Sequence, residues 1–189
     1  KEMFQIAYQA VLDVQGVGSG FDVAASVYGG TMYYVTPGEV IEQLYVGDLP
    51  MIVGYTGIKA DTPTLVRQVA ELKRNEGWVE SVFVVITNLV NKAKTLFEKK
   101  DFVQLGKLMN KNQKLLATLN VSSVELDKMI KGAKDAKAYG AKLSGAGGGD
   151  CMIALTNTKY SEEVIEGIVS AGGIWMNVKT GAEGVRLEK

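Results

Sequence analysis

The sequence predicts an α+β fold in which an antiparallel sheet is covered by helices. β-rich runs lie on both sides of a long middle segment, at 31–56 and 141–156, and the middle segment at 61–139 repeats its apolar residues with the helical period. Strands and helices that are grouped, rather than alternating, favour this class. With 189 residues, 47% of them apolar, the chain is long enough to bury one or two cores.

The first part of the chain predicts two helices and then strands. Apolar residues at helical spacing between Phe4 and Val14 predict a helix, which ends at the glycine-rich segment 16–20. A short helix at 21–28 follows, and Gly29-Gly30 closes it. β-rich runs then predict three strands, at 31–35, 43–46 and 50–56, with a Pro37-Gly38 turn between the first two.

Four helices fit the middle segment. Asp61 or Thr62 is the expected N-cap of the first, because Pro63 is tolerated in a first helical turn. Ser122 or Ser123 is the expected cap of the fourth. The breaks between the helices are expected at Gly77, at Lys99-Lys100-Asp101 and at Asn120.

The C-terminal part returns to mixed structure. Strands are expected at 141–143 and 151–156, joined by a glycine-rich loop. A helix near 161–171 follows, and two more strands near 173–179 and 184–188 complete the prediction.

Composition excludes several classes of function. Basic and acidic residues number 21 each, so no net charge attracts the chain to nucleic acid or to a membrane surface. Histidine is absent, which removes the commonest general base and every Ser-His or Cys-His pair. Cys151 is the single cysteine, so a reducing, cytoplasmic compartment is expected. No apolar run approaches the ~20 residues that span a bilayer.

A glycine-rich loop is the first candidate site. Its backbone can adopt positive φ and bring N–H groups close to an anion such as phosphate. The alternative is a tight connection between strands, for which fewer glycines would suffice. The loop departs from the P-loop pattern, since no Lys-Ser/Thr follows it and a strand comes next. Its residues are Ser144, Gly145, Ala146, Gly147, Gly148, Gly149 and Asp150.

Asp22 is the second candidate. It follows Gly18-Ser19-Gly20 and lies in the first turn of the helix at 21–28, where a carboxylate interacts favourably with the helix dipole. Capping alone explains such a residue, and catalysis is the other interpretation. A carboxylate with a pKa of ~3.9 is a weak base, so it would orient or accept a hydroxyl proton mainly by its position.

Lesser candidates have structural alternatives. Thr56 at a strand end is either a ligand contact or a turn residue, and Asn110 and Gln113 lie within a helix, where such residues usually face water. Cys151 begins an apolar strand and is interpreted as a core residue rather than a nucleophile.

Three segments together resemble the GHMP kinases, the family named for galacto-, homoserine, mevalonate and phosphomevalonate kinases. Lys142 to Leu155 looks like the glycine-rich third motif of the family, and Gly18 to Asp22, followed by Tyr28-Gly29-Gly30, looks like the stretch with the catalytic aspartate. Leu49 to Gly57 resembles the archaeal type of the mevalonate branch, as do two helical stretches at 108–113 and 121–127. Phe21 and Asp150 look more like the phosphomevalonate branch.

The resemblance implies an ATP-dependent, Mg²⁺-assisted kinase that acts on the 5-hydroxyl of mevalonate. By matched position, Asp22 would be catalytic, Ser19, Gly20 and Thr56 would bind substrate, and Gly145, Ala146, Gly147, Gly148 and Gly149 would bind the phosphates of ATP. Residues 1–45 would end the nucleotide-side domain, and 46–189 would form the C-terminal domain. The metal ligands would lie in an N-terminal half that precedes Lys1, without which the chain is expected to be inactive. A homodimer is one possible oligomeric state, which the sequence does not decide.

Three alternatives remain at this point. A phosphomevalonate kinase would need an additional cation for its charged acceptor, which Lys59 or Lys142 could provide. A decarboxylase of the same family is less favoured. In a non-catalytic ligand-binding module, Asp22 would be only a cap and the glycine-rich loop only a turn.

Overall fold

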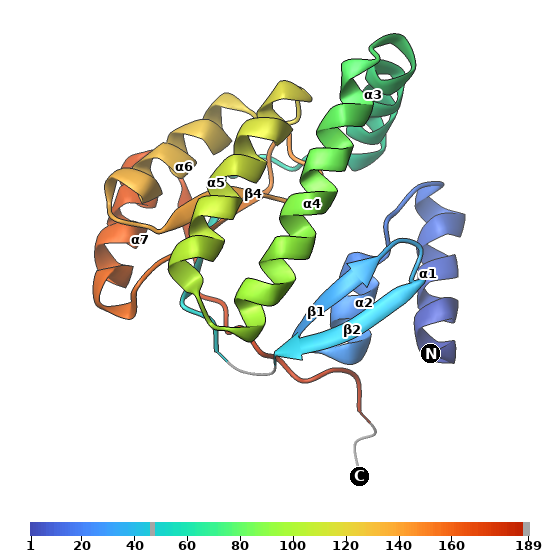
Figure 1. Ribbon diagram of the computed structural model, residues 1–189, viewed down its shortest axis with the longest axis horizontal. Coiled ribbons are helices and arrows are strands. Elements are labelled where there is room, and N and C mark those ends of the chain that lie inside the picture. The colour runs from blue at the N-terminus through green and yellow to red at the C-terminus, as the bar shows by residue number, and fades with distance from the viewer. Residues whose placement is uncertain (46–47, 187–189) are drawn as a thin grey trace. The chain divides into compact units, whose positions relative to one another are not determined.

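The computed structural model describes residues 1–45 and 48–186 (Figure 1). The chain divides into two compact units, of which the first combines residues 1–49 with 179–189 and the second is the continuous segment 50–178. The expected boundary at residue 45 refers to domains of a whole enzyme and stays a prediction. In this chain the second unit begins at Pro50, and the C-terminal tail belongs to the first unit.

The first unit packs two helices with a hairpin. The elements are α1 (Glu2–Gln15), α2 (Phe21–Tyr28), β1 (Thr31–Val35) and β2 (Val40–Tyr45). Phe4 is buried, and its ring contacts the rings of Tyr8, Tyr28 and Tyr34. The second strand begins three residues earlier than expected because Val40 pairs with Val35 across a four-residue turn.

The tail of the chain joins this unit by backbone bonds. The N–H of Gly30 donates to the carbonyl of Ala182 at 2.8 Å, and the N–H of Val185 donates to the carbonyl of Val27 at 3.2 Å. The strand expected at 184–188 is wrong for residues 184–186, since the only pairing there is an isolated bridge between Glu183 and Gly29. Residues 187–188 lie outside the described part.

The second unit is built on a four-stranded antiparallel sheet in the order β4-β5-β3-β6. The strand expected near 173–179 is shorter, because β6 pairs only with Val53 to Tyr55 of β3. Its strands are β3 (Met51–Tyr55), β4 (Gly140–Ser144), β5 (Cys151–Leu155) and β6 (Ile174–Met176).

Helices cover one face of this sheet. Figure 1 shows α5 and α6 beside β4, and α5, α6 and α7 contact strands. Alternate residues of the strands, such as Leu143 and Met152, are fully buried on the helical side. The core also includes Val79 of α4 and Leu126 of α6. The helices are α3 (Thr62–Asn75), α4 (Trp78–Glu98), α5 (Phe102–Thr118), α6 (Val124–Asp135) and α7 (Ser161–Ser170), with a 3₁₀ turn at Thr158–Tyr160.

The predicted fold class and the four middle helices are confirmed. Of the alternatives for the caps, Asp61 accepts from the N–H of Thr64, and Ser123 accepts from the N–H of Leu126. Among residues 1–45 and 48–186, no helix is both long and apolar enough to cross a membrane.

Candidate functional site

Asp22 lies in the first turn of α2 with its side chain exposed to solvent. Gly20 is the N-cap of this helix, with φ of 82°, a left-handed conformation that glycine adopts without strain. One carboxylate oxygen of Asp22 accepts a hydrogen bond from the N–H of Val23 at 2.9 Å. Because Gly20 is the N-cap, Val23 is residue N3, and one oxygen of Asp22 therefore satisfies a free N–H group of the first helical turn. Among the contacts described, the second oxygen of Asp22 is available to a ligand.

Three hydroxyl groups fix the loop before Asp22. Tyr8 donates to the carbonyl of Gly18 at 2.7 Å, and Tyr34 and Thr36 donate to the carbonyl of Ser19 at 2.6 and 3.3 Å. A Cβ on the buried Gly20 would lie 2.7 Å from the Tyr34 hydroxyl oxygen. The tyrosines were missed by sequence reasoning, because their contacts to this loop are 10 and 15 residues away along the chain.

The pKa of the Tyr34 phenol is raised by its surroundings. Burial raises the pKa of Tyr34 above its usual value, and the phenol of Tyr8 and the charge of Asp22 raise it further. Tyr34 therefore stays protonated at neutral pH and acts as a hydrogen-bond donor to the carbonyl of Ser19.

The glycine-rich loop joins β4 to β5 in the second unit, and a Cβ at three of its glycines would come close to a neighbouring atom. A Cβ at Gly147 would overlap the carbonyl oxygen of Val121. At Gly148 it would lie 2.8 Å from a methyl group of Leu65, and at Gly149 it would lie 2.7 Å from the carbonyl oxygen of Ile58. The structure thus supplies a packing reason for Gly147 to Gly149 that the sequence did not reveal.

The start of the loop, at Gly145 to Gly147, has backbone N–H groups without a protein acceptor among the described residues. Gly145 is exposed, has φ of 80°, and has no atom within 4 Å of a Cβ placed there. Within the described residues, the N–H groups of Gly145, Ala146 and Gly147 donate to no protein acceptor, whereas that of Gly148 donates to Val121 at 2.7 Å. Unpaired N–H groups on a loop with positive φ are suited to bind an anion such as a phosphate.

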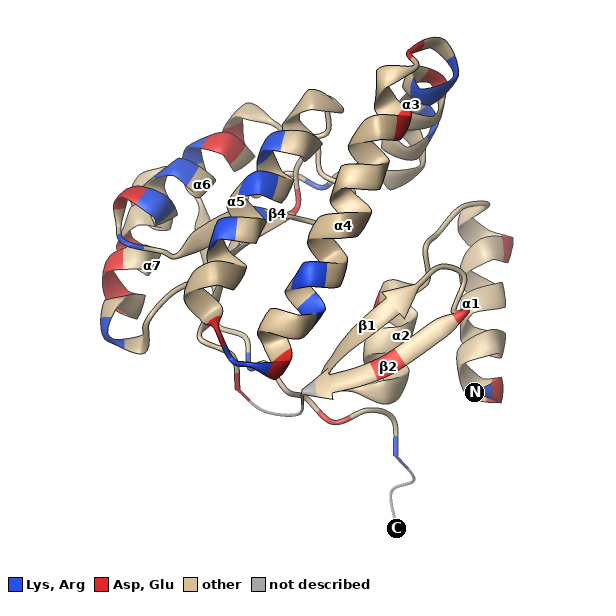
Figure 2. Cartoon of the chain, in the orientation of Figure 1, with Lys and Arg blue, Asp and Glu red and all other residues tan. Residues whose placement is uncertain are grey.

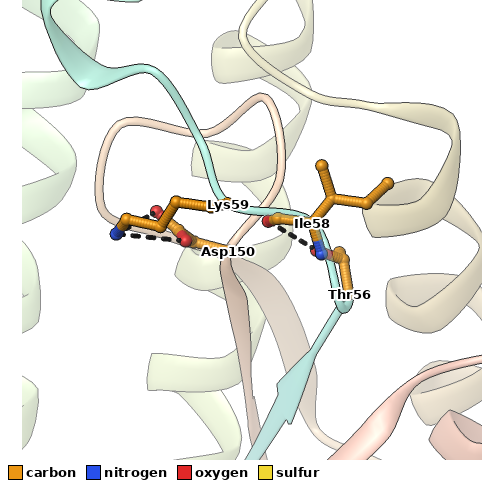
Figure 3. Close-up of polar contacts among 4 residues, drawn as sticks. All are labelled: Thr56, Ile58, Lys59 and Asp150. Carbon is orange, nitrogen blue, oxygen red and sulfur yellow. Dashed lines mark hydrogen bonds and ion pairs between the residues drawn. The ribbon is translucent and has the colours of Figure 1, made fainter.

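Thr56 lies at the end of β3 and borders the glycine-rich loop. Its N–H donates to the carbonyl of Asp150 at 2.9 Å, and the N–H of Asp150 donates to the carbonyl of Ile58 at 2.7 Å. The Thr56 hydroxyl donates to the Ile58 carbonyl at 3.2 Å and accepts from the Ile58 N–H at 3.1 Å (Figure 3). The proton of this hydroxyl is therefore in use, and only a lone pair is left for a ligand.

Lys142 lies in the middle of β4, and Cys151 is the first residue of β5, after the loop. The ammonium of Lys142 donates to the carbonyl of Leu143 at 2.5 Å, and burial lowers the pKa of Lys142 to about 8. Cys151 is half-buried with a free thiol, whose pKa is raised by burial and then by the charge of Asp150. A thiol with a raised pKa is a poor nucleophile, in agreement with its interpretation as a packing residue.

Asn110 and Gln113 serve the fold. The side chain of Asn110 binds the backbone of Tyr139 and Ala141, and that of Gln113 accepts from the N–H of Leu143 at 2.8 Å. Both contact β4, contrary to the usual exposure of such residues in helices. Their structural role therefore outweighs a role in the site.

The structure brings the predicted residues together in two groups. Ser19, Gly20 and Asp22 share one loop and helix start in the first unit. Thr56 and the glycine-rich loop are joined by hydrogen bonds in the second unit. In the described part of the chain, no three carboxylates or thiols form a cluster that could hold a metal ion.

Basic and acidic residues of the second unit are interspersed along its helices (Figure 2). Both signs occur along α6, where Lys131 and Asp135 form an ion pair one turn apart (Figure 2). Charged side chains of this unit therefore form individual ion pairs, such as that of Lys59 with Asp150, rather than one broad surface of a single sign (Figure 2).

The amino-acid sequence of this chain is similar to those of known proteins. The family model described as GHMP kinases C terminal matches residues 93–174. The mevalonate kinase of Thermococcus onnurineus is 40% identical over the whole chain, and that of Pyrococcus abyssi is 39% identical. The chain spans 58% and 57% of the lengths of these two relatives.

A solved structure has the same fold. The structure of L. major mevalonate kinase in complex with R-mevalonate matches with a TM-score of 0.80 and 26% sequence identity. The match covers 90% of this chain and 55% of that one.

Proposed function

The chain belongs to the GHMP kinases, of which it carries the C-terminal portion, and from this premise we propose that the whole protein is a mevalonate kinase. It would transfer the γ-phosphoryl group of ATP to the 5-hydroxyl of mevalonate. The observation that carries this proposal is the identity of 40% and 39% with two mevalonate kinases over the full length of the chain. The unpaired N–H groups at the start of the glycine-rich loop support it, since they fit a phosphate.

Phosphoryl transfer requires mainly positioning and charge stabilisation from the protein. Gly145, Ala146 and Gly147 would donate their free N–H groups to phosphate oxygens. Gly148 and Gly149 would hold the loop in shape through their packing against Leu65 and Ile58. The loop then offers a fixed set of donors that needs little rearrangement when the phosphate arrives.

Asp22 would orient the acceptor hydroxyl and accept its proton. Its exposed carboxylate has one oxygen bound to the N–H of Val23 and the other available. The loop carbonyls of Gly18 and Ser19 are already bound by Tyr8 and Tyr34, so Ser19 would offer the substrate its side-chain hydroxyl. Thr56 would accept a hydrogen bond from the substrate, because its own proton is engaged by Ile58.

Magnesium would neutralise the phosphates of ATP. The residues described here provide no cluster of ligands for it, so we propose that its ligands lie in the part of the relatives' length that this chain does not span. Cytoplasmic location is proposed from the single Cys151, which fits a reducing compartment. A homodimer remains the alternative to a monomer.

Phosphomevalonate kinase is the second candidate, and Asp150 is the observation that favours it. Its acceptor carries a phosphate, which calls for an additional cation. Lys142 is held by the carbonyl of Leu143, and Lys59 is paired with Asp150. Because both ammonium groups are engaged within the protein, mevalonate is the favoured acceptor.

The test is ADP release by the full-length protein with ATP and Mg²⁺, with mevalonate and 5-phosphomevalonate supplied separately. Release with mevalonate alone is expected. Release with 5-phosphomevalonate alone would assign the protein to the second candidate, and release with neither would contradict both. Sedimentation of the same preparation would distinguish the homodimer from the monomer.

A further inference from the structure

An ion pair closes the far end of the glycine-rich loop. The ammonium nitrogen of Lys59 lies 3.4 Å from each carboxylate oxygen of Asp150 (Figure 3). The two partners differ in exposure, since the side chain of Lys59 is 83% exposed and that of Asp150 is 26% exposed. The acid is thus the enclosed member of the pair, and the cation can be removed without disturbing a core.

The backbone holds Asp150 in place. Its N–H and C=O are bound to Ile58 and Thr56, and its φ of 53° is left-handed, a conformation that Asp and Asn tolerate better than most residues. The carboxylate therefore stays beside the loop whether or not a ligand is bound.

The position of the Asp150 carboxylate is unfavourable for the binding of an anion by the loop. Asp150 directly follows the glycines, in the same hairpin as the N–H groups of Gly145, Ala146 and Gly147 that fit an anion. A fixed negative charge beside a phosphate site opposes phosphate binding, and a cation in contact with that charge cancels much of the opposition.

We infer that Lys59 is the counter-ion of Asp150, and that its role is to neutralise this carboxylate so that the loop can accept the phosphates of ATP. The inference rests on the proposed function of the loop. Lys59 is thereby a positioning residue that acts through Asp150, and not a ligand of the phosphate itself. An exposed pair of this kind contributes little to stability, so its effect is expected in nucleotide affinity.

A double-mutant cycle in the full-length protein tests this role. The proteins are the wild type, Lys59→Met, Asp150→Asn and the double variant. Asn is chosen because it preserves the shape of Asp150 and tolerates its left-handed backbone. The measurements are the KM for ATP, kcat, and the Kd of ATP by calorimetry, all at low ionic strength because salt screens exposed charges.

Lys59→Met is expected to raise the KM and the Kd for ATP by about 3- to 10-fold, with kcat changed less than about 2-fold. Asp150→Asn should match or improve on the wild-type affinity. The double variant should behave like Asp150→Asn, because no carboxylate is left to neutralise. The control is Lys131→Met, which removes an exposed lysine that pairs with Asp135 on α6 and should leave all three constants unchanged.

Three results would overturn the inference. An equal loss of affinity when Lys59 is replaced in the Asp150→Asn background would make Lys59 a direct phosphate ligand. No loss in Lys59→Met would make the pair an ordinary surface contact. If the wild type binds ATP but turns over neither acceptor, the proposed function fails and the Kd values still decide the inference. If the wild type does not bind ATP, both are contradicted.

Discussion

Asn110 and Gln113 lie one turn apart on α5 and bind alternate residues along the outer edge of β4. The amide of Asn110 accepts from the N–H of Ala141 at 3.1 Å, and that of Gln113 accepts from the N–H of Leu143 at 2.8 Å. β4 is an edge strand of its sheet, so these N–H groups have no neighbouring strand. The two side chains occupy positions that another chain could otherwise pair with.

Replacing Gln113 by Met should lower the free energy of unfolding by about 2 kcal/mol. The buried N–H of Leu143 would lose its acceptor, and Ser122 would lose the donor that lies 3.0 Å from its hydroxyl. Urea denaturation should show a lower midpoint with an unchanged slope. The control is Gln104→Met, which changes an exposed glutamine of the same helix. Equal midpoints for the two variants would contradict the role of Gln113.

Replacing Gly106 by Ala should destabilise the protein by about 3 kcal/mol, although Ala is the better helix former. A Cβ there would lie 2.5 Å from the carbonyl carbon of Tyr139, where α5 approaches the start of β4. Gly77→Ala is the matched control, because its added Cβ meets nothing within 4 Å and its φ of −60° suits alanine. Thermal unfolding should show a lowered Tm for Gly106→Ala alone. A rise in Tm for both variants would show that α5 can move away from β4.

Lys142 should make stability depend on pH in the alkaline range. Burial lowers its pKa from the usual 10.5 to about 8 in the folded chain. Between these values the unfolded chain binds a proton that the folded chain lacks, so the free energy of unfolding rises with pH. The rise should total about 3 kcal/mol, and below pH 8 the full cost of the buried charge applies.

The variant Lys142→Met isolates this effect, because the other groups titrate in both proteins. At pH 7 it should be the more stable protein, and its advantage over the wild type should shrink as the pH rises from 8 to 10.5. Urea denaturation at several pH values measures the difference. Curves that stay parallel, as expected for the exposed Lys131→Met, would show that Lys142 is well solvated.

Asp22→Asn should lower kcat for ADP release by the full-length protein by about 100-fold or more. The folded chain should tolerate the change, since the side chain is exposed and the Asn oxygen can still accept from the N–H of Val23. Asp13→Asn is the control, because Asp13 is an exposed aspartate on α1 that pairs only with Gln9 among the contacts described. Full activity of Asp22→Asn would contradict a catalytic role of Asp22 and leave it as a residue that only binds the N–H of Val23 in the first turn of α2.

Local signals predicted the elements of this chain well. Asp61 and Ser123 cap helices through their own first turns, so the sequence around each suffices to place the start of the helix. Residues 184–186 show where local signals fail. A strand is expected there from the sequence, but among these described residues the backbone bond to the first unit is that of Val185 to Val27, 158 residues earlier.

The candidate site could be predicted by type but not by geometry. Glycines at 145–149 predicted a loop that can bind an anion, yet only contacts distant in sequence show that Gly147 packs on Val121 and Gly148 on Leu65. Likewise, Lys59 and Asp150 are separated by 91 residues, and no periodicity links them. Such contacts depend on how the strands pair, which a single sequence does not specify.

The return of the tail to the first unit makes the second unit an insertion. Residues 50–178 are continuous, and the register of β3 with β6, in which Val53 opposes Met176, brings the two ends of the segment close together. A module with adjacent ends can be cut out, or exchanged for the corresponding segment of a relative, by two junctions at one place. The glycine-rich loop and the Lys59–Asp150 pair would move together with this segment, so that their properties could be transferred intact into a relative.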